Sequence, residues 1–361
     1  MKHMFIKLAL CMITLFYLTS GYATEKYEPP DGRVLHGLGQ YIPQYYADAE
    51  NWQYVTEYQV TVGHIPVIYS AYAMLDPESA EMDTTNFHNI ANNHGQPYLL
   101  NIGVALQSAQ AWLSGSVSIP ASTILNGSWD NRIKNLAQQI KNLDKPTYLR
   151  PGFEFGTGNS GAHSDPSLTP AQFIAIWKHI YNIFQKEKVT NIAWVWNTVN
   201  PWMFNYMEWY PGDKYVDWWG INFFTSEQIT LSDPFIKNAS LHEKPVMICE
   251  SSPIHNNGAT NSNNWNLWYA PFFSKIASYP NIKAFIYISD PWDRKGWWED
   301  WADSRINSYS TNSIIRRNYK LEMDKSKYIH MEEYQKNPSI IPDVKKSSNT
   351  NLTSIVPLLL E

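Results

Sequence analysis

The sequence predicts an α/β protein built as a single (β/α)8 TIM barrel domain. Eight short apolar runs of strand length recur along the chain, and segments with helical periodicity separate most of them. Alternating strands and helices indicate a parallel sheet, and a count of eight strands indicates that the sheet closes on itself. No internal repeat or linker-like stretch divides the 361 residues, so we expect one large domain.

The first half of the chain contains four expected strands, each an apolar run that ends before a polar or glycine-rich segment. These strands are Val34–Leu38, Ile65–Ala71, Pro97–Ala105 and Pro146–Gly156. Helices are expected between them at Ala47–Tyr58, Thr85–Asn93 and Trp129–Leu143. The third of these helices carries apolar residues at helical spacing, and we expect Ser128 to cap it.

The second half contains four more strands of the same kind. They are Asn191–Trp196, Val216–Phe223, Pro245–Glu250 and Ile282–Ser289. A long helix is expected to start at Thr169-Pro170, a cap followed by proline at the first helical position, and to end near Lys188. Two further helices are expected at Trp265–Ser278 and Ser304–Leu321.

The two ends of the chain differ in character from the barrel domain, which we expect over residues 32–322. A positively charged start, the apolar run Leu8–Leu18 and small residues after it predict a signal peptide at residues 1–23, hence a secreted or periplasmic protein. Residues 335–361 are polar before a short apolar end, and we expect a poorly ordered tail. That apolar end is too short to span a membrane.

Composition points to a carbohydrate partner. The net charge is −5 and no basic stripe suggests a nucleic-acid partner. Aromatic residues make up 15% of the chain, with 16 Trp, and sugar rings stack on indoles, although core packing accounts for about half of them. Metal-binding, phosphate-binding, dinucleotide and GxSxG motifs are absent, so we expect no metal, no cofactor and no acyl hydrolysis. The expected partner is a polysaccharide or oligosaccharide, bound by a monomer.

Two glutamates end matched strands. In the strand Pro146–Gly156, alternation places Arg150 and Glu154 on one face, and Glu154 opens into a glycine-rich loop. Glu250 ends the strand in KPVMICESSP, where Cys249 has the opposite parity and is expected to point toward the outer helices. The two glutamates are 96 positions apart, close to the roughly 94 that three βα units occupy, so both should face the barrel mouth.

Paired carboxyl groups at a barrel mouth are typical of glycoside hydrolysis. A retaining mechanism needs one carboxyl protonated and the other ionised. Arg150 could hold Glu250 ionised, or could form a structural ion pair, and Phe153 and Phe155 would raise the pKa of Glu154. These residues alone leave open which glutamate is the acid.

Other residues at the strand ends are candidates for contacts with a sugar. Asparagine both donates to and accepts from hydroxyl groups. The candidate substrate-binding residues are Arg150, Trp196, Asn197, Asn222, Trp292 and Trp297. Trp292 is the strongest stacking candidate because it follows the eighth strand, whereas packing is the alternative for every Trp.

At this point the sequence resembles glycoside hydrolase family 26, in a clan of (β/α)8 retaining glycosidases. The resemblance rests on YLRPGFEFGTGN, WVWNTVN, WYPGDKYVDWWGINFF and KPVMICESSP, in this order, and covers roughly Gly32–Lys320. It implies that Glu154 is the acid/base and Glu250 the nucleophile. It also implies an endo-acting hydrolase of a β-linked polysaccharide, mannan-like or a β-1,3-xylan or β-glucan.

The sequence departs from the family pattern at two places. Phe153 stands where the family usually has His, and Phe223 and Phe224 stand where a Tyr usually hydrogen-bonds the nucleophile. Both departures remove polar groups from the innermost sugar-binding subsite. One alternative is therefore a carbohydrate-binding pseudoenzyme on the same barrel. A lyase or aldolase is a second alternative, but no Lys or metal set lies at the expected strand ends.

Overall fold

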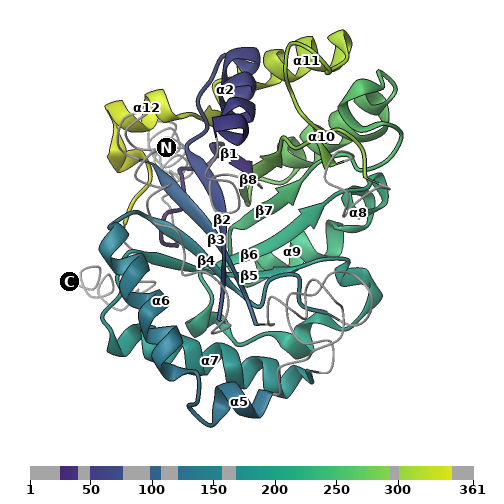
Figure 1. Ribbon diagram of the computed structural model, residues 1–361. Coiled ribbons are helices and arrows are strands. Elements are labelled where there is room, and N and C mark those ends of the chain that lie inside the picture. Colours follow the sequence, from purple (N-terminus) through teal and green to yellow (C-terminus); the bar gives the residue numbers. More distant parts are fainter. Residues whose placement is uncertain are drawn as a thin grey trace, which may run out of the picture.

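The structure, a computed structural model, describes residues 25–39, 49–75, 98–106, 121–156, 168–292 and 301–343. The predicted signal peptide, the expected helix Thr85–Asn93 and residues 344–361 lie outside these ranges. The described chain forms a central barrel of strands with helices around it (Figure 1).

Eight parallel strands form the barrel wall. They are β1 (Val34–Gly39), β2 (Ile68–Met74), β3 (Leu99–Ala105), β4 (Thr147–Pro151), β5 (Ile192–Thr198), β6 (Trp218–Phe223), β7 (Val246–Ser251) and β8 (Ile282–Ile288). Each strand pairs with the next, and β1 pairs with both β8 and β2, which closes the barrel. The predicted fold is confirmed, and seven of the eight expected strands lie within three residues of the observed bounds. Only β4 differs more, because it ends at Pro151.

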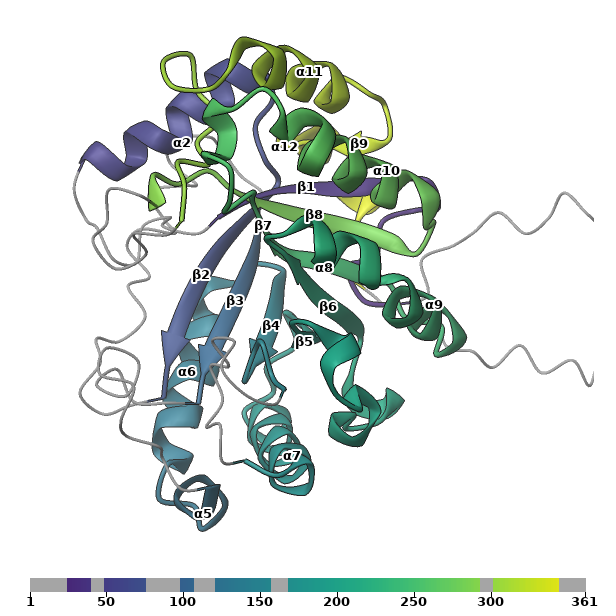
Figure 2. The ribbon, with the colours of Figure 1, turned by 90° about the vertical axis from the view of Figure 1, so that its right-hand side faces the viewer.

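Helices cover the outside of the barrel (Figure 2). They are α2 (Ala49–Val62), α5 (Ala121–Leu125), α6 (Asp130–Leu143), α7 (Pro170–Lys186), α8 (Ser226–Leu231), α9 (Asp233–Leu241), α10 (Ala270–Ser278), α11 (Ser313–Met323) and α12 (Met331–Lys336). The expected start of α7 is confirmed, since the Thr169 side chain accepts from the Gln172 N–H in a capping box.

Two helix expectations need correction, and one pair of helices was not predicted. Ser128 does not cap α6, because Trp129 occupies the N-cap position and makes no side-chain cap bond. The last expected helix begins at Ser313 rather than Ser304, since the Asn307 side chain accepts from two backbone N–H groups and makes a turn there. The helices that were not predicted from the sequence are α8 and α9, between β6 and β7.

The barrel interior is filled by side chains rather than open. Tyr148 of β4, Trp218 of β6 and Met247 of β7 belong to one buried cluster inside the wall. Trp194 and Ile248 belong to a second, larger cluster on the outer side, where the strands pack against the helices. Inward and outward residues alternate along most strands, and polar side chains occupy several of the inward positions at the strand ends.

Strand β7 breaks this alternation and overturns the expectation for Cys249. The register with β6 shifts beyond Ile221, so that Ile248 opposes Ile221 but Glu250 opposes Asn222. Cys249 belongs to the inner cluster together with Met247, while Val246 and Ile248 pack outside, and the bulge turns Glu250 to the inner side as well. Cys249 therefore points into the barrel, not toward the helices, and Glu250 still reaches the mouth. Burial raises the pKa of its thiol to about 12, so it stays a neutral packing group.

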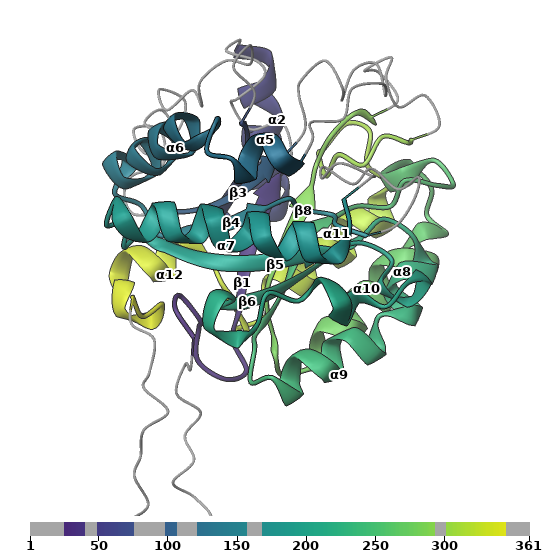
Figure 3. The same cartoon turned by 90° about the horizontal axis from the view of Figure 1, so that it is seen from below.

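Segments from both ends of the described chain close the other end of the barrel. The Tyr148 hydroxyl donates to the Tyr27 carbonyl, and the Tyr27 N–H donates to the Pro342 carbonyl. The N-terminal segment and α12 lie side by side when the molecule is seen from below (Figure 3). Ile341 is also buried, so the described part of the segment after Tyr334 packs against the barrel.

Candidate active site

Glu250 lies at the C-terminal end of β7, and its side chain is anchored from two other strands. Its Oε1 accepts a hydrogen bond from Arg150 Nη1 of β4 at 2.8 Å and from the Tyr72 hydroxyl of β2 at 2.9 Å. The Arg150 guanidinium is fully buried, and the Glu250 carboxylate is nearly so. A charged partner and two donors favour the ionised carboxylate, as the sequence analysis considered for Arg150.

Tyr72 is the main site residue that the sequence analysis missed. Its ring lies 5.4 Å from the Phe153 ring, and the Arg150 guanidinium carbon lies 4.9 Å from the centre of the Phe153 ring. Gly103 of β3 makes room for both rings, because a Cβ there would lie 2.9 Å from Tyr72 and 3.0 Å from Phe153. The expected second strand ended at Ala71, which left Tyr72 outside the predicted barrel wall.

Two asparagines connect the two glutamates. Arg150 Nη1 donates to Asn197 Oδ1 at 2.9 Å, and Asn197 Nδ2 donates to Asn222 Oδ1 at 3.2 Å. Asn222 Nδ2 then donates to Glu154 Oε1 at 2.7 Å. Because Arg150 can only donate, the direction of every amide in this chain of hydrogen bonds follows from it. Both asparagines are almost completely buried, so they position the glutamates rather than offering free groups to a sugar.

Glu154 follows β4 in a tight turn rather than ending the strand, as the sequence analysis expected. Gly152 has φ +58° and Glu154 has φ +56°, a backbone conformation that is uncommon for glutamate. Phe155 fixes the turn, since it bridges to Thr198 of β5, whose hydroxyl donates to the Phe155 carbonyl. The left-handed backbone conformation at Glu154 directs its side chain toward Asn222.

Glu154 is buried, with only 8% of the residue exposed. Burial, followed by the negative charge of Glu250, raises its pKa to about 8, although the Asn222 hydrogen bond and Arg150 act in the opposite direction. At neutral pH, Glu154 is therefore mostly protonated, whereas Glu250 lies against a full positive charge. The site combines a proton donor with a carboxylate, which is the pairing that glycoside hydrolysis uses.

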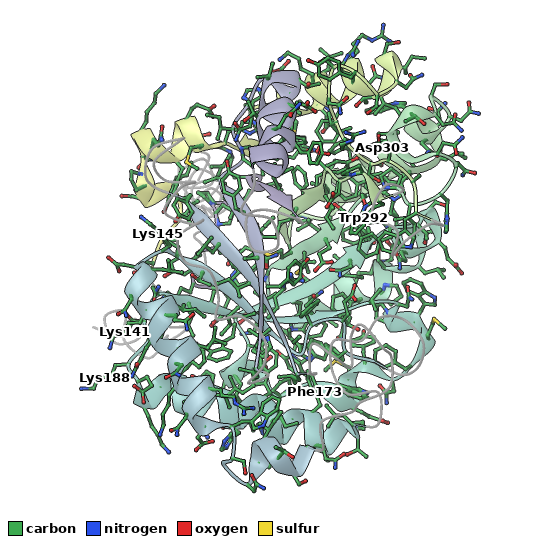
Figure 4. The ribbon with its side chains drawn as sticks, in the orientation of Figure 1. Lys141, Lys145, Phe173, Lys188, Trp292 and Asp303 are labelled. Carbon is green, nitrogen blue, oxygen red and sulfur yellow. The ribbon has the colours of Figure 1, made fainter. Side chains whose placement is uncertain are left out.

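The structure buries two of the three tryptophans that were expected to contact a sugar. Trp196 is fully buried on the outer side of the wall, with its ring 4.7 Å from that of Phe155. Trp292 lies at the mouth near Asp303 (Figure 4), but it is 2% exposed and packs with Phe224. These placements argue against sugar stacking on either ring. Trp297 lies outside the described residues.

Neither a metal-ion site nor a membrane-spanning helix occurs in the described part of the chain. No group of three or more His, Cys, Asp or Glu side chains is arranged to hold a metal ion among those residues. Within the same ranges, none of the helices is both long and apolar enough to cross a bilayer.

Comparison with known proteins links this site to a hydrolase family. The model of the family described as "Glycosyl hydrolase family 26" matches residues 86–290, more than half of the chain. Among curated proteins, a "Beta-1,3-xylanase TXYA" of Vibrio sp is 25% identical over 316 residues, which cover 77% of this chain and 62% of that protein. A "Beta-1,3-xylanase" of Alcaligenes sp is 26% identical over 214 residues, covering 51% of this chain and 44% of the relative.

The fold also matches solved structures. The catalytic domain of an endo-β-1,4-mannanase of this family from Bacillus sp. JAMB-750 superposes with a TM-score of 0.62 at 15% sequence identity. The match covers 84% of this chain and 89% of that domain. At this identity the likeness concerns the barrel alone. The chain spans less than two thirds of the length of either xylanase.

Proposed function

The chain belongs to glycosyl hydrolase family 26, and we propose that it cleaves a β-linked polysaccharide internally by a retaining, double-displacement mechanism. Glu154 is the acid/base and Glu250 the nucleophile. The observation that carries this proposal is that the surroundings of the two carboxyl groups favour opposite protonation states. Glu250 accepts from Arg150 and Tyr72, while burial keeps Glu154 protonated with a pKa of about 8.

In the first step, the ionised Glu250 carboxylate attacks the anomeric carbon of the sugar and forms an ester bond to it. The bond from that carbon to the glycosidic oxygen breaks, and Glu154 gives its proton to the leaving oxygen. The saccharide on the leaving side departs as a neutral alcohol. Glu154 is then a carboxylate, and Glu250 is a neutral ester.

The second step uses the electrostatic coupling between the two glutamates. The negative charge on Glu250 is one cause of the raised pKa of Glu154. Ester formation removes that charge, so the pKa of Glu154 falls at the stage when a base is needed. Glu154 then takes a proton from water, the oxygen attacks the anomeric carbon, and the ester bond to Glu250 breaks. Two displacements leave the product in its original β configuration.

This mechanism requires the two carboxyl groups to lie about 5–5.5 Å apart, against roughly 6.5–9.5 Å in inverting enzymes. We keep the shorter separation as a prediction. Proton NMR of the first-formed reducing ends tests it, because a retaining enzyme releases the β anomer. An initial α anomer would contradict the mechanism.

The substrate class is proposed from the relatives. Both curated relatives named above are called β-1,3-xylanases, and the structural relative is called a β-1,4-mannanase. We propose β-1,3-xylan as the first substrate to test, with β-mannan and β-glucan beside it. Reducing-sugar release with product sizing identifies the substrate, and a ladder of intermediate lengths indicates internal cleavage. Binding of one glycan without turnover across the whole panel would favour the carbohydrate-binding pseudoenzyme.

The roles of the two glutamates are separated by azide rescue on an activated aryl glycoside that the wild type cleaves. Glu154→Ala still forms the ester because the leaving group needs little acid assistance, and acid catalysis contributes typically 10²–10⁴-fold otherwise. Added azide then attacks the ester and gives the β-glycosyl azide. Glu250→Ala forms no ester, so azide attacks directly and gives the α product. Swapped configurations would reverse the two roles.

Export is a separate part of the proposal. The charged start and apolar run of residues 1–23 support removal of this segment during secretion or transfer to the periplasm. Mass spectrometry of the protein from a bacterial host's extracellular and periplasmic fractions tests this. A mature N-terminus at Thr24 is expected, and retention of the full chain in the cytoplasm would contradict it.

A further inference from the structure

We infer that Tyr72 of β2 positions the nucleophile, donating the hydrogen bond that β6 does not supply in this protein. The inference rests on the proposed function and adds a residue to it. At the end of β6, Phe223 packs in the outer cluster and Phe224 packs with Trp292, and neither side chain has a polar atom. The Tyr72 hydroxyl reaches Glu250 from the other side of the barrel interior.

The geometry gives the two oxygens of Glu250 different tasks. Both donors, the Tyr72 hydroxyl and Arg150 Nη1, contact Oε1. Among the residues that the structure describes, no donor lies within hydrogen-bonding distance of Oε2. Oε2 therefore keeps its lone pairs for attack on the anomeric carbon, while Oε1 becomes the carbonyl oxygen of the ester. A donor to Oε1 fixes the rotation of the carboxylate and hence the direction of attack.

Tyr72 is held in place for this task. Its ring packs with Phe153 in the space left by Gly103, and the Arg150 guanidinium carbon lies 5.7 Å from the ring centre. Burial and the nearby charge of Glu250 hold its pKa well above the usual range, so the hydroxyl stays protonated and remains a donor. Because the Tyr72 hydroxyl is already oriented toward Glu250, it can keep this hydrogen bond during the reaction without any free-energy cost for reorganisation.

The test compares Tyr72→Phe with Tyr148→Phe in the full-length protein. Both changes delete one buried hydroxyl inside the same barrel, but Tyr148 donates to the Tyr27 carbonyl at the opposite end. Tyr72→Phe should lower kcat about 10- to 100-fold with KM changed less than threefold. That is below the 10²–10³-fold typical for a lost oxyanion-hole donor, because Arg150 remains. Tyr148→Phe should keep the wild-type kcat.

A pH readout separates positioning from packing. Within the described ranges of the chain, the ionisable groups around Glu250 are Arg150, Tyr72, Glu154 and Cys249. Tyr72→Phe removes a donor whose hydrogen bond to the ionised carboxylate is stronger than its bond to the protonated carboxyl, so the acid limb of the pH–activity profile should move to higher pH. Tyr148→Phe should leave the profile in place.

A second readout does not depend on turnover. With ¹³C-labelled glutamate, the Glu250 carboxyl resonance, assigned by its loss in Glu250→Gln, should titrate at higher pH in Tyr72→Phe than in the wild type. An unchanged titration would overturn the inference, whether or not a substrate is found. An inactive wild type whose resonance shifts as expected would instead contradict the proposed function and leave the contact established.

Discussion

Glu154 acts as an acid because of where its carboxyl group lies, and this makes activity depend on pH in a defined direction. Its pKa is raised to about 8 by burial and by Glu250. Above that pH the proton needed by the leaving oxygen is lost, so kcat/KM on polysaccharide should fall about tenfold per pH unit. Rates measured from pH 6 to 10 test this.

The Asn222 hydrogen bond provides the control for this pH limb. It favours the ionised form of Glu154, so its removal in Asn222→Ala should move the alkaline limb to still higher pH. An alkaline limb that does not move would show that another group controls it.

The same burial predicts that Glu154 destabilises the fold at neutral pH. A folded-state pKa above the unfolded value of about 4.5 gives stability that is fully present below pH 4.5 and lost as the pH rises through 8. Glu154→Gln should therefore raise the free energy of unfolding by about 2–3 kcal/mol at pH 7, with little change at pH 4.5. Urea denaturation at both pH values measures this, with the exposed Glu227→Gln as a control that should change little.

The sequence could identify those site residues whose role follows from their residue type and their position along the chain. Glu154 and Glu250 were predicted to meet at the mouth from their spacing, and the structure connects them through Arg150 and two asparagines. Tyr72 was missed because its role depends on which strands face each other across the interior. Trp196 was expected to contact a sugar but lies on the outer side of the barrel wall. Whether the last residues of a strand point inward or outward depends on its alignment with neighbouring strands, which the sequence does not show.

Strand β7 shows why alternation misled the analysis. A bulge adds one residue to a strand without any signal in composition, and it puts Cys249 and Glu250 both on the inner side. Conversely, the strands and long helices were predictable because apolar periodicity and the capping box at Thr169 are local properties of the chain. Short helices such as α8 lack that periodicity over a useful length.

The bulged strand β7 makes a close contact with β6 that can be tested. A Cβ on Gly220 would lie 2.7 Å from Cys249 Sγ and 2.8 Å from Asn197 Cβ. Gly220→Ala should therefore cost about 1–3 kcal/mol of stability and lower activity, because overpacking displaces Asn197 from its hydrogen bonds. Combining it with Cys249→Ala should recover part of that loss, since one clash is removed. Fully additive effects in chemical denaturation would contradict this contact.

The whole barrel depends on segments that the sequence analysis set aside. The chain after α11 returns to the barrel as β9 (Tyr328–Ile329), which pairs with β1, and then as α12. There His330 Nδ1 lies 2.9 Å from His36 Nδ1, and the other ring nitrogen of His36 contacts the Tyr58 hydroxyl at 2.7 Å. This histidine contact joins β1, α2 and the C-terminal segment, so its protonation state bears on the stability of the entire molecule.

Both histidines are held neutral in the fold. Burial, then the charge of a second histidine, lowers the pKa of His330 to about 4 and that of His36 well below its usual range. The charged or titratable groups facing them are His64, Asp324, Glu333 and the Tyr58 hydroxyl. In the unfolded chain both residues take up a proton near pH 6.5. The unfolded state therefore binds more protons between about pH 6.5 and 4, and stability must fall as the pH falls through that range.

The loss should be about 3–4 kcal/mol between pH 7 and pH 5 for the two histidines together. Glu154 acts in the opposite direction over the same range, because its stabilising contribution returns as the pH falls. The measurement is therefore best made in Glu154→Gln. This variant lacks the contribution of Glu154 to the pH dependence and keeps that of the two histidines. In that background, adding His330→Gln should reduce the pH dependence of the unfolding free energy by about half. The glutamine amide can still donate to the Met323 carbonyl, which His330 Nε2 contacts at 2.9 Å. If the slope is the same with and without His330, the cluster is not the source of acid sensitivity.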